Sequence, residues 1–204
     1  MTLTALRDSW LYQWHGANEA LFLWLNHAQW PGKDALAAAG TFIGDHRWFP
    51  VYLAVALTIA YRKPAWIKPD RLLVFVWSYL LSWLIIAQLK PALDFPRPLS
   101  ALGESWVHVV GRPELHHSFP SGHSTFVFLL LFSLSPGAAM PIRWGLIGLA
   151  FWVAWSRIAV GAHFPADVLG GALLGIFCVM VVTSVLHLVC PRDDILPPTR
   201  DPQE

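Results

Sequence analysis

The chain has 204 residues, a formal net charge of +1, and is 55% hydrophobic but only 13% charged. A typical soluble domain is about 25% charged, so this deficit and the long charge-free runs indicate a membrane protein, organised as a single domain over 1–204. The near-neutral charge, without a basic stripe, argues against nucleic-acid binding. Twelve tryptophans fit the membrane interpretation, because Trp is enriched at membrane interfaces.

The first sixty residues predict short or interfacial segments. Residues 1–17 are mixed and aromatic, which favours an amphipathic helix on the membrane surface, and they lack the features of a cleaved signal peptide. Residues 18–30 are apolar but shorter than the roughly 20 residues of a spanning helix, so a tilted span and an interfacial piece both stay open. Segments 35–44 and 48–61 flank the charged triplet at 45–47. They form either one broken span or a half-helix followed by a span.

The triplet Asp45-His46-Arg47 has two interpretations. It either approaches a site from the first helices or marks a helix end at the interface. A charged group at the edge of a bilayer is often stabilised simply by reaching water. We therefore favour the second interpretation.

The rest of the chain contains apolar runs of the kind that cross membranes. These runs are 72–89, 125–142, 144–156 and 168–190. Pro136-Gly137 is expected to end the second helix early. In the last run, Gly171-x-x-x-Gly175 predicts close packing against another helix. The polar, Pro-rich tail at 191–204 predicts disorder.

The last run also holds both cysteines, Cys178 and Cys190. Their spacing does not suggest zinc, and free cysteines are commonly buried and inert. We expect no chemical role for either of them.

The basic loops predict the orientation of the spans. Three basic positions fall on one side when the spans alternate: 62–71, Arg143 and Arg192. Basic loops are typically cytoplasmic. The opposite side then gathers the three charged stretches of the apolar part of the chain, which are 90–98, 116–124 and 155–167. We expect these stretches to meet and to form a phosphate site.

The first evidence for phosphate is a set of three cations, Lys90, Arg97 and Arg157. Charges at the edge of a bilayer are costly unless they have partners. Each cation alone could simply extend to the interface. Three on one face, beside two histidines, favour a phosphate ligand, because guanidinium groups bind its oxygens bidentately.

The second piece of evidence for a phosphate site is the start of the helix that follows Phe119-Pro120. Ser121 precedes an apolar run, which marks a helix N-terminus with free backbone N–H groups that bind anions. Gly122 lets a ligand approach the backbone, and His123 falls in the first turn. Taken alone, these residues fit an ordinary capped helix with a histidine at the interface equally well.

The third piece of evidence is the His163–Asp167 pair. Pro165 predicts the first turn of the last helix, so Asp167 can reach back to the imidazole. A carboxylate on one ring nitrogen fixes the tautomer and makes the other nitrogen more basic, as a nucleophile requires. A helix-capping pair is the alternative. A metal site is disfavoured, because only one carboxylate is nearby and the cations would repel the ion; we predict no metal and no cofactor.

Together these stretches resemble the type 2 phosphatidic acid phosphatase (PAP2) superfamily, whose signature has the parts K-x6-R-P, P-S-G-H and S-R-x5-H-x3-D. The matching residues are Lys90-x6-Arg97-Pro98, Pro120-Ser121-Gly122-His123 and Ser156-Arg157-x5-His163-x3-Asp167. All three parts match without departure and in order. The resemblance covers roughly residues 70–190 and leaves the first seventy without a matching motif.

The resemblance implies an all-α integral membrane bundle of about six transmembrane helices, with an acid phosphatase–haloperoxidase-like core. His163 would be the nucleophile and form a phosphohistidine, and Asp167 would orient it. His123 would protonate the leaving oxygen and then activate water. The phosphoryl oxygens would be held by three cations and two backbone amides, namely Lys90, Arg97, Arg157, Ser121 and Gly122.

A site at the membrane face implies a lipid phosphate as substrate. Small bacterial members of the family suggest undecaprenyl diphosphate first, with phosphatidylglycerol phosphate, phosphatidate and lipid A as alternatives. They also suggest the bacterial inner membrane, with the site facing the periplasm or outside. Four polar residues of the loop before His123 either contact the head group or are solvated, and we favour solvation for each: Arg112, Glu114, His116 and His117.

Two further functions stay open beside hydrolysis. The first is phosphotransfer from the phosphohistidine to an acceptor lipid. The second is a non-catalytic role as a lipid transporter or scaffold. Soluble haloperoxidases share the signature, but the apolar runs argue against a soluble chain. The oligomeric state is not predicted.

Overall fold

The computed structural model describes residues 10–189, and these form helices without a strand. The elements are α2 (Trp10–Gln13), η1 (Trp14–Gly16), α3 (Ala17–His27), α4 (Lys33–Ile43), η2 (His46–Trp48), α5 (Phe49–Arg62), α6 (Asp70–Leu93), α7 (Pro98–Leu102), α8 (Gly122–Leu134), α9 (Met140–Ala159) and α10 (Pro165–Val189). The predicted all-α bundle is confirmed, and the expected count of about six membrane helices is roughly consistent with it. The predictions for 1–9 and for the tail at 191–204 lie outside the described residues.

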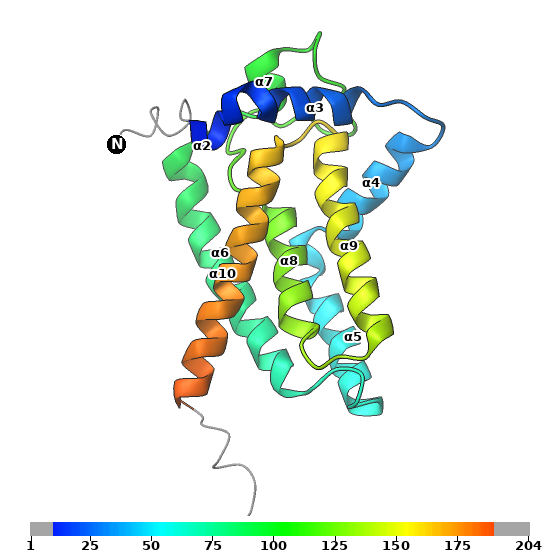
Figure 1. Ribbon diagram of the computed structural model, residues 1–204, viewed down its shortest axis with the longest axis vertical. Helices are drawn as coiled ribbons and strands as arrows, with labels where there is room; N and C mark the ends of the chain where they lie inside the picture. Colours follow the sequence, from blue (N-terminus) through cyan, green and yellow to red (C-terminus); the bar gives the residue numbers. More distant parts are fainter. Residues whose placement is uncertain (1–9, 190–204) are drawn as a thin grey trace, which may run out of the picture.

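Helix α8 is the centre of the bundle, packed against α6, α9 and α10 (Figure 1). Its closest neighbour is α10, and glycines make that approach possible. A Cβ added at Gly171 would lie 2.4 Å from the Ser121 carbonyl oxygen, and one at Gly175 would lie 2.5 Å from that of Thr125. The close packing predicted from the Gly-x-x-x-Gly spacing is therefore confirmed. It places the N-terminus of α8 directly against the first turns of α10.

The N-terminal segments settle the alternatives left open by the sequence. Helix α3 lies across one end of the bundle instead of spanning it (Figure 1). Asn26 anchors α3, since its side-chain amide donates to the His108 carbonyl at 2.8 Å and accepts from the His108 amide at 2.8 Å. Helices α4 and α5 are separate elements joined through η2, so the segment is broken at the charged triplet.

The outer surface of the bundle is apolar. Within residues 10–189, the helical segments 70–102 and Pro165–Val189 are long and apolar enough to cross a membrane, and most of their side chains are not buried inside the protein. On α10, for example, Leu173, Phe177 and Met180 are all more than half exposed. Apolar side chains exposed over whole helices need a lipid environment. The protein is therefore a membrane protein.

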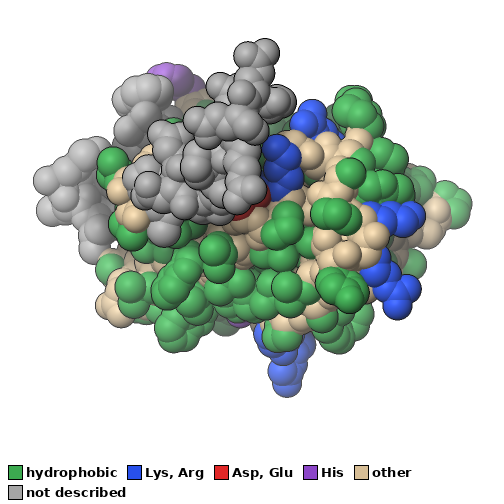
Figure 2. All heavy atoms as spheres, turned by 90° about the horizontal axis from the view of Figure 1, so that it is seen from below, with side chains coloured by type: hydrophobic (Ala, Val, Ile, Leu, Met, Phe, Trp, Pro, Cys, Tyr) green, Lys and Arg blue, Asp and Glu red, His purple; other side chains and the backbone are tan. Residues whose placement is uncertain are grey.

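The end of the bundle opposite α3 carries the predicted basic loops. The α5–α6 and α8–α9 loops meet there, where the Ala139 amide donates to the Trp66 carbonyl at 3.1 Å. Figure 2 looks onto this end and shows Lys and Arg side chains spread among hydrophobic ones. The sequence places Arg62, Lys63, Lys68 and Arg143 in or next to these loops. Cations are thus common at this end, away from the three signature stretches.

Candidate active site

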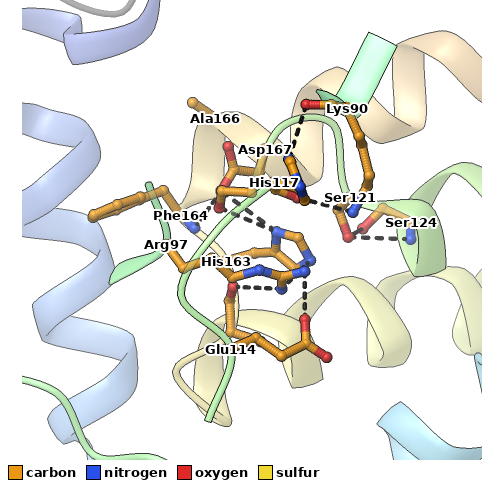
Figure 3. A network of polar contacts seen from close by, with 12 residues as sticks. Lys90, Arg97, Glu114, His117, Ser121, Ser124, His163, Phe164, Ala166 and Asp167 are labelled. Carbon is orange, nitrogen blue, oxygen red and sulfur yellow. Dashed lines mark hydrogen bonds and ion pairs between the residues drawn. The ribbon is translucent and has the colours of Figure 1, made fainter. Parts of the chain in front are cut away.

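The three signature stretches meet at the α3 end of the bundle, as predicted. Lys90 at the end of α6 donates from Nζ to the His117 carbonyl at 3.0 Å. Arg97 reaches His163, with 3.1 Å between Nη1 and Nε2. Figure 3 shows Lys90 of α6, Arg97 before α7 and His163 before α10 gathered around the loop that precedes α8. The predicted convergence is therefore confirmed, whereas the chemical role of each residue stays a prediction.

The His163–Asp167 pair lies at the buried start of α10. Pro165 is the first residue of that helix, as expected. The Asp167 carboxylate lies 3.5 Å from His163 Nδ1. It also accepts hydrogen bonds from the Phe164 amide at 2.9 Å and from the Ser118 hydroxyl at 2.5 Å. Asp167 thus holds both the imidazole and the backbone turn before the helix.

The contacts of the imidazole define its tautomer. A guanidinium has no acceptor, so Arg97 can only donate to His163 Nε2. Burial, reinforced by the charges of Arg97 and Arg157, lowers the pKa of His163 well below its usual range. The ring is therefore neutral at pH 7, with its proton on Nδ1 facing Asp167. The lone pair is on Nε2, which faces the cations, as a nucleophile for an anionic substrate requires.

The two arginines are both buried, with only 5% of each exposed. Arg97 is paired with Glu114 and donates to the Ala162 carbonyl at 3.0 Å. Arg157 donates from Nη1 to the Thr41 hydroxyl at 3.2 Å. Its buried Nε has no hydrogen-bond partner among residues 10–189. An orphaned buried donor is costly, and a phosphoryl oxygen in the adjoining cavity would satisfy it.

In the Pro-Ser-Gly-His stretch, Ser121 has a structural role, whereas Gly122 and His123 line the site. Ser121 is the N-cap of α8, and its own amide donates to the Asp167 carbonyl at 3.0 Å. That amide is therefore already engaged, which weakens the prediction that it holds a phosphoryl oxygen. Gly122 and His123, in contrast, both line a cavity with His163.

Two cavities meet at the site. The first, of about 260 Å³, contains His163 and Lys90 and continues along α6 past Ile86, Trp83 and Tyr79. The second, of about 350 Å³, lies between α4 and the loop at 109–112. Three residues line both cavities: Glu114, His123 and Arg157. A substrate that reaches these residues can thus have an apolar part along α6 and a polar part under the loop.

Several residues in contact with the signature had no motif to identify them. The Tyr12 hydroxyl donates to Asp167 at 2.8 Å, and Thr41 binds Arg157. A lone tyrosine or threonine far from the motif carries no spacing signal. Ser118 lies three residues before Ser121 and could have been proposed from proximity alone. The sequence indicates Glu114 only as one polar residue of its loop.

The charged triplet was only partly understood from the sequence. Asp45 does begin a helical turn, because it is the N-cap of η2. It also lines the second cavity with His123, and His46 lines the first. The favoured interpretation, a helix end at the interface, is therefore incomplete. Among residues 10–189 there is no group of three His, Cys, Asp or Glu side chains placed to hold a metal ion.

Comparison with known proteins agrees with this geometry. The sequence profile of the PAP2 superfamily matches residues 71–189. The lipid A 1-phosphatase of Rhizobium johnstonii is 30% identical over 170 residues, which cover 74% of this chain and 66% of that protein. The undecaprenyl-diphosphatase of Sulfolobus acidocaldarius is 29% identical over 170 residues, covering 78% of this chain and 74% of that protein.

A solved structure shares the fold. The crystal structure of Aquifex aeolicus LpxE superimposes with a TM-score of 0.70 at 28% identity, over 82% of this chain and 95% of that one. The matched segments span between 37% and 74% of the lengths of the first curated relatives. The profile match covers more than half of the chain and includes every signature residue discussed above. The chain belongs to the PAP2 superfamily.

Proposed function

We propose that the protein is a membrane lipid phosphatase that acts through a phosphohistidine on His163, as one domain over 1–204. The observation that carries this proposal is the position of His163 Nε2, which lies 3.1 Å from Arg97 Nη1 in a cavity that is also lined by Arg157, whose Nε is without a partner among the described residues. Phosphoryl transfer depends mainly on positioning and on stabilising charge. A buried cluster of cations around a nucleophilic nitrogen supplies both.

The reaction has two steps. In the first, His163 Nε2 forms a bond to phosphorus while the bond from phosphorus to the leaving oxygen breaks, and His123 gives that oxygen its proton. Asp167 accepts from Nδ1–H and stabilises the positive charge that the ring acquires. In the second, His123 takes a proton from water, the water oxygen attacks phosphorus, and the bond to Nε2 breaks. Lys90 and the two arginines hold the phosphoryl oxygens, and the products are free phosphate and the dephosphorylated lipid.

The substrate class follows from the cavity along α6. Its lining by Tyr79, Trp83 and Ile86 suits an apolar chain whose phosphate lies at Lys90 and His163. Undecaprenyl diphosphate is the leading candidate, and hydrolysis would break its phosphoanhydride bond. Phosphatidylglycerol phosphate, phosphatidate and lipid A remain alternatives. The relatives named an undecaprenyl-diphosphatase and a lipid A 1-phosphatase support this range.

The orientation follows from the basic end of the bundle. Because basic loops are typically cytoplasmic, the site at the other end faces the periplasm of a bacterial inner membrane. A cysteine introduced as Ala65→Cys, in the α5–α6 loop, should react with a membrane-permeant reagent only. Labelling of intact cells by an impermeant reagent would reverse the assignment.

The test of function is a phosphate-release assay on purified protein. The panel contains undecaprenyl diphosphate, phosphatidylglycerol phosphate, phosphatidate and lipid A, each with and without an acceptor lipid. We expect release that persists in chelator and disappears in His163→Ala. Transfer to the acceptor would identify a phosphotransferase. Activity retained in the variant would refute the nucleophile, and inactivity of the wild type on all four lipids would favour a transporter or scaffold.

A further inference from the structure

The carboxylate of Asp45 is held in a fixed place at the join between α4 and α5. Its Oδ1 accepts from the Arg47 amide at 2.9 Å, and its Oδ2 accepts from Arg47 Nε at 2.9 Å and from Nη2 at 2.6 Å. Only 13% of the Asp45 side chain is exposed, against 82% for Arg47. The arginine thus fixes the carboxylate from the solvent side and leaves it within the protein.

The fixed carboxylate faces the cavity that contains His123. Asp45 and His123 both line the second cavity, while His46 lines the first beside His123. Element η2, which Asp45 caps, packs on α8, the helix that carries His123 in its first turn. Tyr79 on α6 steadies η2 through a 3.5 Å hydrogen bond to the His46 carbonyl. The packing of η2 against α8 and its hydrogen bond to α6 therefore fix the position of Asp45 relative to the His123 ring.

The charges around His123 are unequal in sign. Burial of the ring is the largest influence and opposes its protonation, and the basic groups Arg157 from α9, Lys90 from α6 and His46 from η2 oppose it further. Arg97 and His163 also line the first cavity with it, and Arg47 and Arg112 line the second. The acidic group that acts on it is Asp45. Glu114 also lines both cavities, and it is paired with Arg97 as Asp45 is paired with Arg47. Nearby cations disfavour an imidazolium, and an anion favours it.

Asp45 remains an anion over the pH range in which an enzyme works. Burial opposes its ionisation, but the hydrogen bonds from Arg47 and the proximity of His123 and His46 lower its pKa to about 2. The carboxylate is therefore ionised at neutral pH, with Arg47 at 2.6 Å and His46 at 3.6 Å as its partners. It supplies that charge beside the only histidine that lines both cavities among the described residues.

We propose that Asp45 is a positioning residue that favours the protonated form of His123, from which the proton passes to the leaving oxygen. The inference rests on the proposed phosphatase function and extends it to a segment before the residues matched by the family profile. A general acid must be protonated before the bond to the leaving group breaks. Burial and the surrounding cations oppose protonation of His123, and Asp45 is the anion that partly offsets them. Asp45 does not touch the substrate and acts through His123.

The test compares Asp45→Asn with the wild type in a pH–rate profile for an alkyl or diphosphate lipid substrate. Because activity is lost as His123 loses its proton, removing the anion should move the alkaline limb of kcat to lower pH by about one unit. KM should change less than twofold. Asp45→Glu should restore most of the wild-type profile. Asp34→Asn is the matched control, since Asp34 pairs with His108 at 2.9 Å and lines neither cavity.

A second substrate separates this role from a structural one. A nitrophenyl phosphate has a leaving oxygen that departs without a proton, so Asp45→Asn should retain nearly full activity on it. Equal loss on both substrates, or an unchanged profile in Asp45→Asn, would overturn the inference while wild-type phosphate release still supports the function. Wild-type protein that releases no phosphate from any substrate would overturn both.

Discussion

Tyr12→Phe tests how far the site depends on a residue outside the signature. The Tyr12 hydroxyl donates to Asp167 Oδ1 at 2.8 Å, and both side chains are buried. Burial and the neighbouring Asp167 charge raise the pKa of Tyr12 above its usual range, so the hydroxyl stays protonated and remains a donor. The substitution removes this donor and leaves the ring packed edge-on against Phe95, with 4.9 Å between centroids.

The size of the effect follows from the other partners of the carboxylate. A hydrogen bond to a charged group contributes about 1.5–3 kcal/mol. Asp167 keeps its bonds from Ser118 and from the Phe164 amide, so we expect the lower end of that range. About 1.4 kcal/mol corresponds to tenfold in rate. If Asp167 stabilises the charged His163 ring in the transition state, kcat should fall about tenfold with little change in KM.

The assay is phosphate release from the best lipid substrate, measured beside thermal unfolding in detergent. Tyr52→Phe is the control, because the Tyr52 hydroxyl donates to the Ile43 carbonyl at 3.0 Å, outside the cluster around Asp167. That variant should lose some stability and keep its kcat. An unchanged kcat in Tyr12→Phe, or equal losses of kcat in both variants, would refute the proposed coupling through Asp167.

Two further predictions concern stability. Gly171→Ala should lower the free energy of unfolding by about 1–3 kcal/mol, because the added Cβ would lie 2.4 Å from the Ser121 carbonyl oxygen. Gly145→Ala should leave the free energy of unfolding nearly unchanged, because a Cβ added there has no neighbouring atom within 4 Å. Equal shifts of the unfolding temperature in the two variants would contradict the packing argument. Lowering the pH from 7 to 5 should reduce the contribution of His163 to stability, because burial depresses the pKa of folded His163 and only the unfolded chain then takes up its proton. With an unfolded pKa of about 6.5, this amounts to about 2 kcal/mol, which His163→Gln should remove from the pH dependence of unfolding.

The core of the fold was predictable because its helices are long, apolar and clearly bounded. Pro165 begins α10 as expected, and α8, the helix of the second apolar run, ends at Leu134, before Pro136. The segment before α6 was harder, because its helices have only 11 to 14 residues. Helices of that length are compatible with lying on a membrane, entering it or spanning it with a neighbour. Tertiary contacts, such as those of Asn26, decide among these.

The arrangement of the site was predictable for a topological reason. Successive spans alternate in direction, so stretches after one span and before another fall at the same end. Lys90, His123 and His163 follow that rule. Alternation does not predict which other side chains form hydrogen bonds to the signature residues. Contacts such as Thr41 with Arg157 join elements more than a hundred residues apart in the chain, and no sequence spacing encodes them.

These completing contacts change how the N-terminal segment should be understood. The family profile begins at residue 71, yet the chain before it supplies a partner to several signature residues. Tyr12 binds Asp167, Thr41 binds Arg157, and Asp45 shares a cavity with His123. Buried charges need such partners to remain both charged and fixed in place. The N-terminal helices thus help to hold the signature side chains in place. Substitutions in this segment should therefore alter activity although every signature residue is kept.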